Sequence, residues 1–267
     1  MKNRSGIITY MILVFLLSSI GYYLIINAKA LGLNPLLIMF YLMWSPALSG
    51  IITSLIHEKS LKGLGLGTVQ ARWLLAAYAL PFLYGGLAYS VIWLAGWGAL
   101  NSAYHFDLFK LVIMGTLINV AFAAGEEIGW RGYLVPQLYK HFNYTSTCLI
   151  TGLIWSVWHF PLIISGVYLA SMPMLPQLLL LVVTVTAMTF PISWLRLRSG
   201  SVWAAVLMHA SHNLYLQCLY DPLTLPTGPL SKYMLGESGL VLAVIFIALA
   251  VFFWRQRGRL PLAGNHI

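Results

Sequence analysis

The sequence predicts an all-α protein that spans a membrane, with about eight transmembrane helices packed in one bundle. Its 267 residues are 60% hydrophobic and only 8% charged, and the mean hydropathy is +0.83. Soluble domains contain only about 45–50% apolar residues. Uncharged runs of about 20 residues, the length that crosses some 30 Å of hydrocarbon, recur along the chain. These observations indicate a polytopic membrane protein whose full length, residues 1–267, forms a single transmembrane domain.

Eight apolar runs, separated by short polar segments, account for the expected helices. They cover residues 7–26, 36–56, 73–95, 109–124, 146–165, 177–195, 201–219 and 239–254. The first run follows Lys2 and Arg4 and ends near Ala28-Lys29-Ala30, which also resembles a signal-peptide cleavage site. It is longer than the roughly 7–15 residues of a signal-peptide core, so we favour a retained helix. Cleavage there would leave the remaining topology unchanged.

The distribution of Lys and Arg predicts which side of the membrane each loop faces. With a cytoplasmic N-terminus, 12 basic residues lie inside and three lie outside, as the positive-inside rule requires. The inner residues are Lys2, Arg4, Lys59, Lys62, Arg72, Arg131, Lys140, Arg196, Arg198, Arg255, Arg257 and Arg259, and the outer ones are Lys29, Lys110 and Lys232. We therefore expect both termini in the cytoplasm. The short chain is typical of a prokaryotic cytoplasmic membrane protein.

Net charge and cysteine content do not indicate a nucleic-acid-binding protein or a protein held together by disulfides or thiolate metal sites. The formal charge of +9 does not indicate a nucleic-acid partner, because the basic residues are scattered between apolar runs and form no patch. Cys148 and Cys218 both lie within apolar runs and have no CxxC spacing. Neither a disulfide framework nor a thiolate metal site is therefore expected.

Three charged residues in the segment AFAAGEEIGWRGYL, residues 121–134, mark the first part of a candidate site. An ionisable side chain at membrane depth costs roughly 2.5–3.5 kcal/mol, so Glu126, Glu127 and Arg131 indicate a polar cavity. Glu127 and Arg131 are four residues apart and can form an ion pair on one helix face, whereas Glu126 points about 100° away. On their own, these charges fit an interfacial salt-bridge cluster equally well.

Two later apolar runs add His159, His209 and Asn213. In the segment HASHN, His209 and Asn213 are four residues apart, so an imidazole and a carboxamide share one helix face. Taken alone, each of these residues would also fit a simpler role, namely a hydrogen bond that holds two helices together. Counted at about 1.5 Å per residue from the cytoplasmic ends, His159, His209 and Glu126 all fall in the cytoplasmic half, with Glu126 near the inner interface. We therefore expect one cavity that opens inward.

Together, EEIGWRGYL, His159 and the HxxxN pattern of His209 and Asn213 resemble the three motifs of the CPBP intramembrane proteases. This family comprises the CAAX-prenyl-protease-like and bacteriocin-processing, or Abi, proteins. The resemblance is strongest from about Leu111 to Leu219, which predicts a catalytic core over residues 111–219. The family usually has Phe four residues before the second-motif histidine, where this chain has Trp155. We expect this aromatic exchange to affect the shape of the cavity more than its chemistry.

The resemblance implies an intramembrane endopeptidase that hydrolyses a peptide bond of a membrane-associated protein or peptide. Glu126 would be the general base, and His159 would help to hold and polarise the attacking water. His209 and Asn213 would donate hydrogen bonds to the tetrahedral oxyanion. Prenylated CAAX proteins, peptide bacteriocins and membrane anchors are all substrates that fit the family, and a short prokaryotic chain favours a substrate without a prenyl group.

Supporting roles and a metal ion complete what the resemblance implies. Glu127 and Arg131 would orient Glu126 and tune its acidity. The family is often described as metalloproteases, and Glu126, His159 and His209 match the ligand types of a catalytic Zn site. The motif HExxH is absent. We therefore expect water activation without an obligatory cofactor, and a divalent metal such as Zn is the alternative.

Two other functions fit the buried charges. A proton- or ion-coupled transporter also needs ionisable groups at membrane depth. Carriers, however, usually place their site near the midplane at the interface of a repeat, and no repeat is visible in this chain. A catalytically silent membrane scaffold is the second alternative, and the intact motifs count against it.

Overall fold

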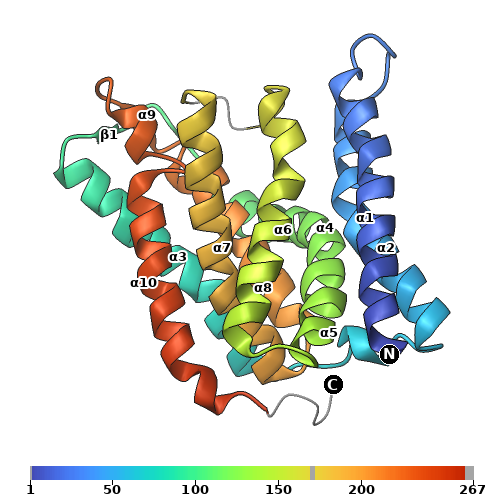
Figure 1. Cartoon of the computed structure of the whole chain (residues 1–267). Helices are drawn as coiled ribbons and strands as arrows, with labels where there is room; N and C mark the ends of the chain where they lie inside the picture. The colour runs from blue at the N-terminus through green and yellow to red at the C-terminus, as the bar shows by residue number, and fades with distance from the viewer. Residues whose placement is uncertain (1, 169–171, 262–267) are drawn as a thin grey trace.

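The computed structural model describes residues 2–168 and 172–261, which form a bundle of long helices (Figure 1). The helices are α1 (Lys2–Ile26), α2 (Pro35–His57), α3 (Ala71–Leu94), α4 (Thr116–Glu127), α5 (Val135–Tyr139), α6 (Tyr144–Ile164), α7 (Met174–Ser199), α8 (Val202–Tyr215), α9 (Ser231–Met234) and α10 (Leu240–Arg255). Strands β1 (Gly98–Leu100) and β2 (Thr224–Pro226) pair antiparallel and join the loops that follow α3 and α8. The structure therefore confirms the all-α class.

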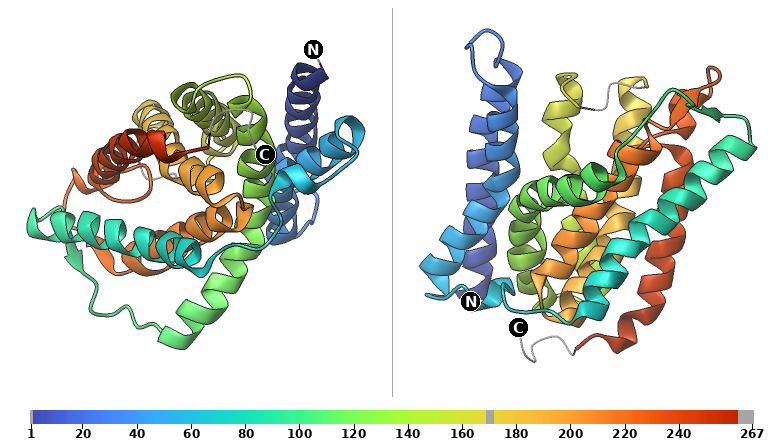
Figure 2. Two further views of the ribbon diagram at one scale, coloured as in Figure 1. Left: turned by 90° about the horizontal axis from the view of Figure 1, so that it is seen from below. Right: turned by 180° about the vertical axis from the view of Figure 1, so that it is seen from behind.

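Seven helices of the described residues are long and apolar enough to cross a membrane. They cover Ser5–Ile26, Pro35–His57, Ala71–Leu94, Lys110–Tyr139, Tyr144–Ile164, Met174–Ser199 and Leu240–Arg259. With α4 and α5 counted as one helix and the short α9 left aside, successive helices run in opposite directions (Figures 1 and 2). As a result, the basic segments after α2 and α5 and at the ends of α7 and α10 lie at one end of the bundle. Arg131 is an exception, because its side chain is fully buried within the bundle.

The bundle exposes apolar side chains and buries charged ones. Leu37, Leu75 and Leu94 are 69%, 70% and 89% exposed, whereas Glu127 and Arg131 are completely buried. A soluble protein has the reverse distribution, because charged side chains are almost never fully buried unless they are paired. Exposed leucines at these positions match a hydrocarbon environment. The surface is therefore that of a membrane protein.

The eighth expected helix, residues 201–219, is observed as α8 and the π-helical segment Leu216–Tyr220. It packs against α3, α4 and α7 and is not among the seven candidate spans. Every residue of α8 except Trp203 and Leu207 is buried. Because protein surrounds α8 on several sides, it can carry His209 and Asn213 without exposing them to lipid.

The fourth helix is longer than the sequence predicts. We expected it to end at residue 124, but the helix continues through Glu126 and Glu127 and the π-helical segment Ile128–Leu134 to Tyr139, and it bends in Figure 2. Glu126 therefore precedes the end of the helix by about 20 Å, at about 1.5 Å per residue. The expectation that Glu126 lies near the inner interface is wrong. The charges do not end the helix, because partners within the bundle surround them.

Two glycines allow α2 to lie very close to this helix. A Cβ atom at Gly125 would lie 2.5 Å from the backbone oxygen of Met43, and one at Gly129 would lie 2.3 Å from the carbonyl carbon of Pro46. Gly125 and Gly129 form a GxxxG pattern, which is common where membrane helices pack closely. This packing turns the two intervening glutamates away from α2, towards α6 and α8. The pattern is visible in the sequence, although we did not use it there.

Candidate active site

Four polar side chains line one cavity of about 390 Å³ inside the bundle. They are Glu126 from α4, His159 from α6, and His209 and Asn213 from α8. The other lining residues are mostly apolar: Leu36, Met39, Met43, Ile118, Asn119, Phe122, Trp158, Leu162, Tyr168, Gln217 and Cys218. The structure thus brings together the four residues that the sequence predicts to be catalytic, from helices that are far apart in the chain.

The cavity lies in the half of the bundle away from the basic end. Its lining includes residues from the beginning of α2 and from the ends of α6 and α8. Both regions are at the opposite end from the loops after α2 and α5 (Figure 1). Our expectation that the cavity lies on the side of the basic residues is therefore wrong. The estimated depth of Glu126 was wrong because the fourth helix was expected to end at residue 124, whereas it continues to Tyr139.

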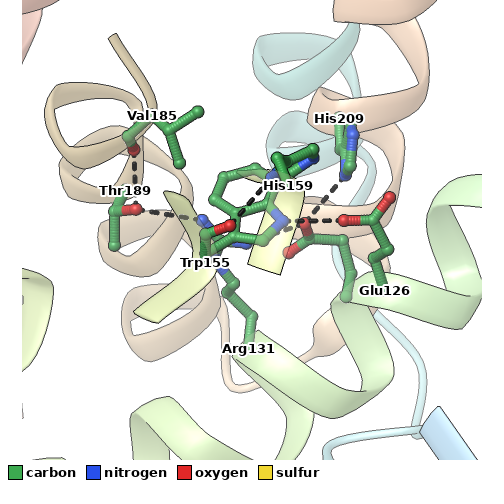
Figure 3. A network of polar contacts seen from close by, with 8 residues as sticks. Glu126, Arg131, Trp155, His159, Val185, Thr189 and His209 are labelled. Atoms are coloured by element: carbon green, nitrogen blue, oxygen red, sulfur yellow. Dashed lines mark hydrogen bonds and ion pairs between the residues drawn. The ribbon is translucent and has the colours of Figure 1, made fainter. Parts of the chain in front are cut away.

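The carboxylate of Glu126 accepts a hydrogen bond from the indole of Trp155. The distance from Nε1 of Trp155 to Oε2 of Glu126 is 2.7 Å (Figure 3). Both side chains are buried, with 2% and 3% exposure for Glu126 and Trp155. Phenylalanine has no N–H group and could not form this bond. The aromatic exchange at residue 155 therefore adds a hydrogen bond to Glu126, which the sequence did not reveal.

The imidazole of His159 is held by its own helix. Its Nδ1 atom lies 2.8 Å from the backbone oxygen of Trp155, one turn earlier. A carbonyl oxygen can only accept a hydrogen bond, so Nδ1 carries a proton and Nε2 of the neutral ring is an acceptor. The ring of Trp158 packs edge-on against His159, with 5.0 Å between the ring centroids. His159 is therefore oriented, with one nitrogen available to accept a proton or a hydrogen bond.

Glu127 is the centre of a buried ionic network. Its Oε1 atom lies 2.9 Å from an Nη atom of Arg131 and 2.9 Å from Nδ1 of His209. The other Nη atom of Arg131 donates to Oγ1 of Thr189 at 3.2 Å, and the guanidinium lies 4.0 Å from the centre of the Trp155 ring. Sequence reasoning assigned Glu127 and Arg131 to Glu126. Glu127 contacts the imidazole of His209 directly, and Arg131 reaches Glu126 only through the ring of Trp155 (Figure 3).

Asn213 lies one helical turn beyond His209 and is 8% exposed. Within residues 2–168 and 172–261, its carboxamide has no hydrogen-bond partner. Since Asn213 lines the cavity, its N–H groups are available to a ligand there.

A further carboxylate near the cavity was not identified from the sequence. Glu237, in the loop before α10, accepts hydrogen bonds from Tyr168 and Gln217, and its Oε1 lies 3.3 Å from Nε2 of His212. Burial acts to raise the pKa of Glu237, but the hydrogen bonds from these three residues lower it to about 2. Tyr168 and Gln217 line the cavity, so Glu237 holds part of its wall. No spacing to another charged residue marks Glu237 in the sequence.

The residues of the cavity do not form a metal site in this arrangement. Among residues 2–168 and 172–261, no group of three or more His, Cys, Asp or Glu side chains is placed to hold a metal ion. The contacts of Glu126 with Trp155 and of His209 with Glu127 use one atom of each side chain and leave Oε1 of Glu126 and Nε2 of His209 free. What this arrangement lacks, among the described residues, is a common position around which Glu126, His159 and His209 are grouped.

Comparisons with known proteins match the part of the chain that forms the cavity. Residues 108–215 match the family model described as Type II CAAX prenyl endopeptidase Rce1-like. One curated relative is CAAX prenyl protease 2 of Methanococcus maripaludis, which is 44% identical over 41 residues. This alignment spans 15% of our chain and 15% of the relative. The matched residues 108–215 include all six predicted site residues, so the similarity to CAAX proteases falls on the part of the chain that forms the cavity.

Proposed function

We propose that the protein is an intramembrane endopeptidase that hydrolyses a peptide bond of a membrane-associated protein or peptide. The main support is that the buried carboxylate of Glu126 shares one largely apolar cavity with His159, His209 and Asn213. A carboxylate and imidazoles can move protons, and a carboxamide can stabilise an oxyanion. The family match over residues 108–215 supports the same reaction class.

In the proposed reaction, Glu126 takes a proton from a water molecule in the cavity. The water oxygen attacks the carbonyl carbon of the substrate, a C–O bond forms, and the carbonyl electron pair moves onto the oxygen. Nε2 of His159 accepts a hydrogen bond from the same water and holds it. Glu126 then gives its proton to the leaving amine as the C–N bond breaks, so proton and electron counts balance.

His209 and Asn213 would stabilise the negative oxygen of the tetrahedral intermediate. Nδ1 of His209 is paired with the carboxylate of Glu127, which favours the protonated ring and lets Nε2 donate to the oxyanion. The carboxamide of Asn213 supplies a second donor. Donors that are fixed before the reaction cost no reorganisation when the charge develops.

Replacement of Asn213 by Ala is expected to lower kcat by about 10²- to 10³-fold, which is the usual effect of losing one oxyanion donor. The measurement is the steady-state cleavage of a synthetic peptide that spans a site cut by the wild-type protein. Asn27→Ala is the control, because the side-chain amide of Asn27 donates to the backbone oxygen of Tyr23 in α1, and Asn27 does not line the cavity. If Asn213→Ala kept the wild-type kcat, the carboxamide of Asn213 would have no role in the mechanism.

We propose that the reaction needs no obligatory metal or other cofactor. Cleavage by the purified protein is expected to continue at an unchanged rate after dialysis against EDTA and 1,10-phenanthroline. A loss of activity that added Zn²⁺ restores would contradict this proposal. The metal would then bind the free Oε1 of Glu126 and the free Nε2 of His209, with Trp155 and Glu127 as supporting partners.

We further infer that residues 111–219 are the catalytic core of one transmembrane domain, residues 1–267. The basic residues support an orientation with both termini in the cytoplasm, and the location that we propose is a prokaryotic cytoplasmic membrane. Its partners would be the lipid bilayer and a membrane-associated substrate. The relative is named as a prenyl protease, so prenylated CAAX peptides form one arm of the substrate test. Bacteriocin precursors, which the resemblance to the CPBP family also suggests, form a separate arm.

The test uses purified protein in liposomes, together with membrane proteins extracted from cells that lack it. Mass spectrometry of new peptide termini is expected to show cleavage sites that appear with the wild-type protein and not with Glu126→Gln. Farnesylated CAAX peptides and bacteriocin precursors are added to parallel samples. A transporter would give ion flux across the liposomes without new termini, and a scaffold would give neither.

A further inference from the structure

We propose that Trp155 is a positioning residue of this site: its indole N–H holds the carboxylate of Glu126 so that the other carboxylate oxygen faces the water. This inference rests on the proposed peptidase function. Three observations carry it, namely the contact with Glu126, the fixed position of the ring, and the backbone contact with His159.

The first observation is that Trp155 supplies the hydrogen bond that orients Glu126. Its Nε1 atom lies 2.7 Å from Oε2 of Glu126, and no other donor contacts this carboxylate within the described part of the chain. An indole N–H can only donate, so the direction of the bond is fixed. Oε1 of Glu126 is left without a protein partner in a residue that lines the cavity. This oxygen is the one available to take a proton from water.

The second observation is that the indole ring is clamped. The guanidinium of Arg131 lies 4.0 Å from the ring centre, and the ring of His209 packs edge-on at 5.4 Å between centroids. Arg131 is itself held by Glu127, at 2.9 Å. Rotation of the indole would break these contacts. The direction of its N–H is therefore set before substrate binds, as a precise catalytic geometry requires.

The third observation is that Trp155 also fixes His159, but through its backbone. The backbone oxygen of Trp155 lies 2.8 Å from Nδ1 of His159. One residue therefore sets the position of both the base and the imidazole that holds the water. Replacing the Trp155 side chain by phenylalanine keeps the backbone contact to His159 and removes the N–H group that contacts Glu126. This separation makes the inference testable.

The test compares Trp155→Phe with Trp194→Phe on the synthetic peptide. Phenylalanine keeps an aromatic face for Arg131 but has no N–H. Trp194 is also buried, 8% exposed, and its Nε1 donates to the backbone oxygen of Gln256 at 3.2 Å, outside the cavity. Trp155→Phe is expected to lower kcat about 10- to 100-fold, as misplaced catalytic groups do, with KM changed less than about twofold. Trp194→Phe is expected to change neither.

A second substitution separates the N–H from the shape of the ring. Benzothienylalanine, incorporated at residue 155, has the outline of tryptophan with sulfur in place of N–H, and the same loss of kcat is expected. In a Glu126→Gln background, Trp155→Phe should have no additional effect on the residual rate, because it acts through Glu126.

Three results would overturn the inference. Wild-type kcat in both Trp155 variants, with Glu126→Gln inactive, would reject the positioning role and leave the proposed function standing. An equal loss of kcat in the wild-type and Glu126→Gln backgrounds would assign Trp155 a structural role. Wild-type cleavage by Glu126→Gln would reject both the inference and the proposed function.

Discussion

Glu126→Gln is expected to abolish peptide cleavage, with kcat lowered by about 10²- to 10⁴-fold, the usual contribution of a general base. The amide of glutamine cannot take a proton from water at neutral pH. Its oxygen can still accept the hydrogen bond from Trp155, so the fold should be retained. The measurement is kcat on the synthetic peptide, together with the unfolding midpoint of the same preparation.

Glu58→Gln is the matched control for this substitution. Glu58 caps the end of α2 and accepts a hydrogen bond from Gln137, and it does not line the cavity. The control is expected to cleave the peptide at the wild-type rate. If Glu126→Gln also cleaved within about twofold of the wild-type rate, Glu126 would not be the base.

Glu127→Met is expected to destabilise the protein by about 3–5 kcal/mol, the range for removing one partner of a buried ion pair. Both Glu127 and Arg131 are fully buried, at 2.9 Å. Without Glu127, the contacts that the guanidinium keeps among the described residues are the Thr189 hydroxyl and the face of Trp155. The measurement is reversible unfolding by SDS in mixed micelles. The double variant Glu127→Met/Arg131→Met should recover part of the loss, because no unpaired charge remains.

Lys110→Met is the control for this prediction. Lys110 forms an ion pair with Asp107 at 3.8 Å, but the two side chains are 77% and 51% exposed. Exposed pairs contribute little to stability, so the unfolding midpoint should not change. The account of the buried network would be contradicted if Glu127→Met unfolded at the same SDS fraction as Lys110→Met.

Most of the helices could be predicted from hydropathy, because a segment that crosses hydrocarbon needs about 20 apolar residues. The expected helices 36–56 and 146–165 differ from the observed Pro35–His57 and Tyr144–Ile164 by one or two residues. The helix expected over 109–124 was wrong at its end. Hydropathy treats Glu126 and Glu127 as the end of a span, and it does not reveal that partners on α6 and α8 allow them to be buried.

The chemical identity of the site residues could also be predicted, together with the contact between Glu127 and Arg131 within one helix. The contacts between different helices could not. The spacing of Glu127 and Arg131 predicts their ion pair, because four residues make one helical turn. The contact between Glu127 and His209 joins residues 82 positions apart, and only the packing of α4 against α8 creates it. The role of Trp155 was missed for the same reason. A tryptophan in an apolar run has the same hydropathy pattern whether or not its N–H finds a buried carboxylate.

The central claim is that a water molecule activated at Glu126 hydrolyses a peptide bond. Cleavage of the synthetic peptide in H₂¹⁸O, followed by mass spectrometry of the product, tests it most directly. We expect the new carboxyl group to carry one oxygen from the solvent with the wild-type protein, and about 10²- to 10⁴-fold less product with Glu126→Gln. Product without ¹⁸O, or an equal yield from Glu126→Gln, would contradict the account.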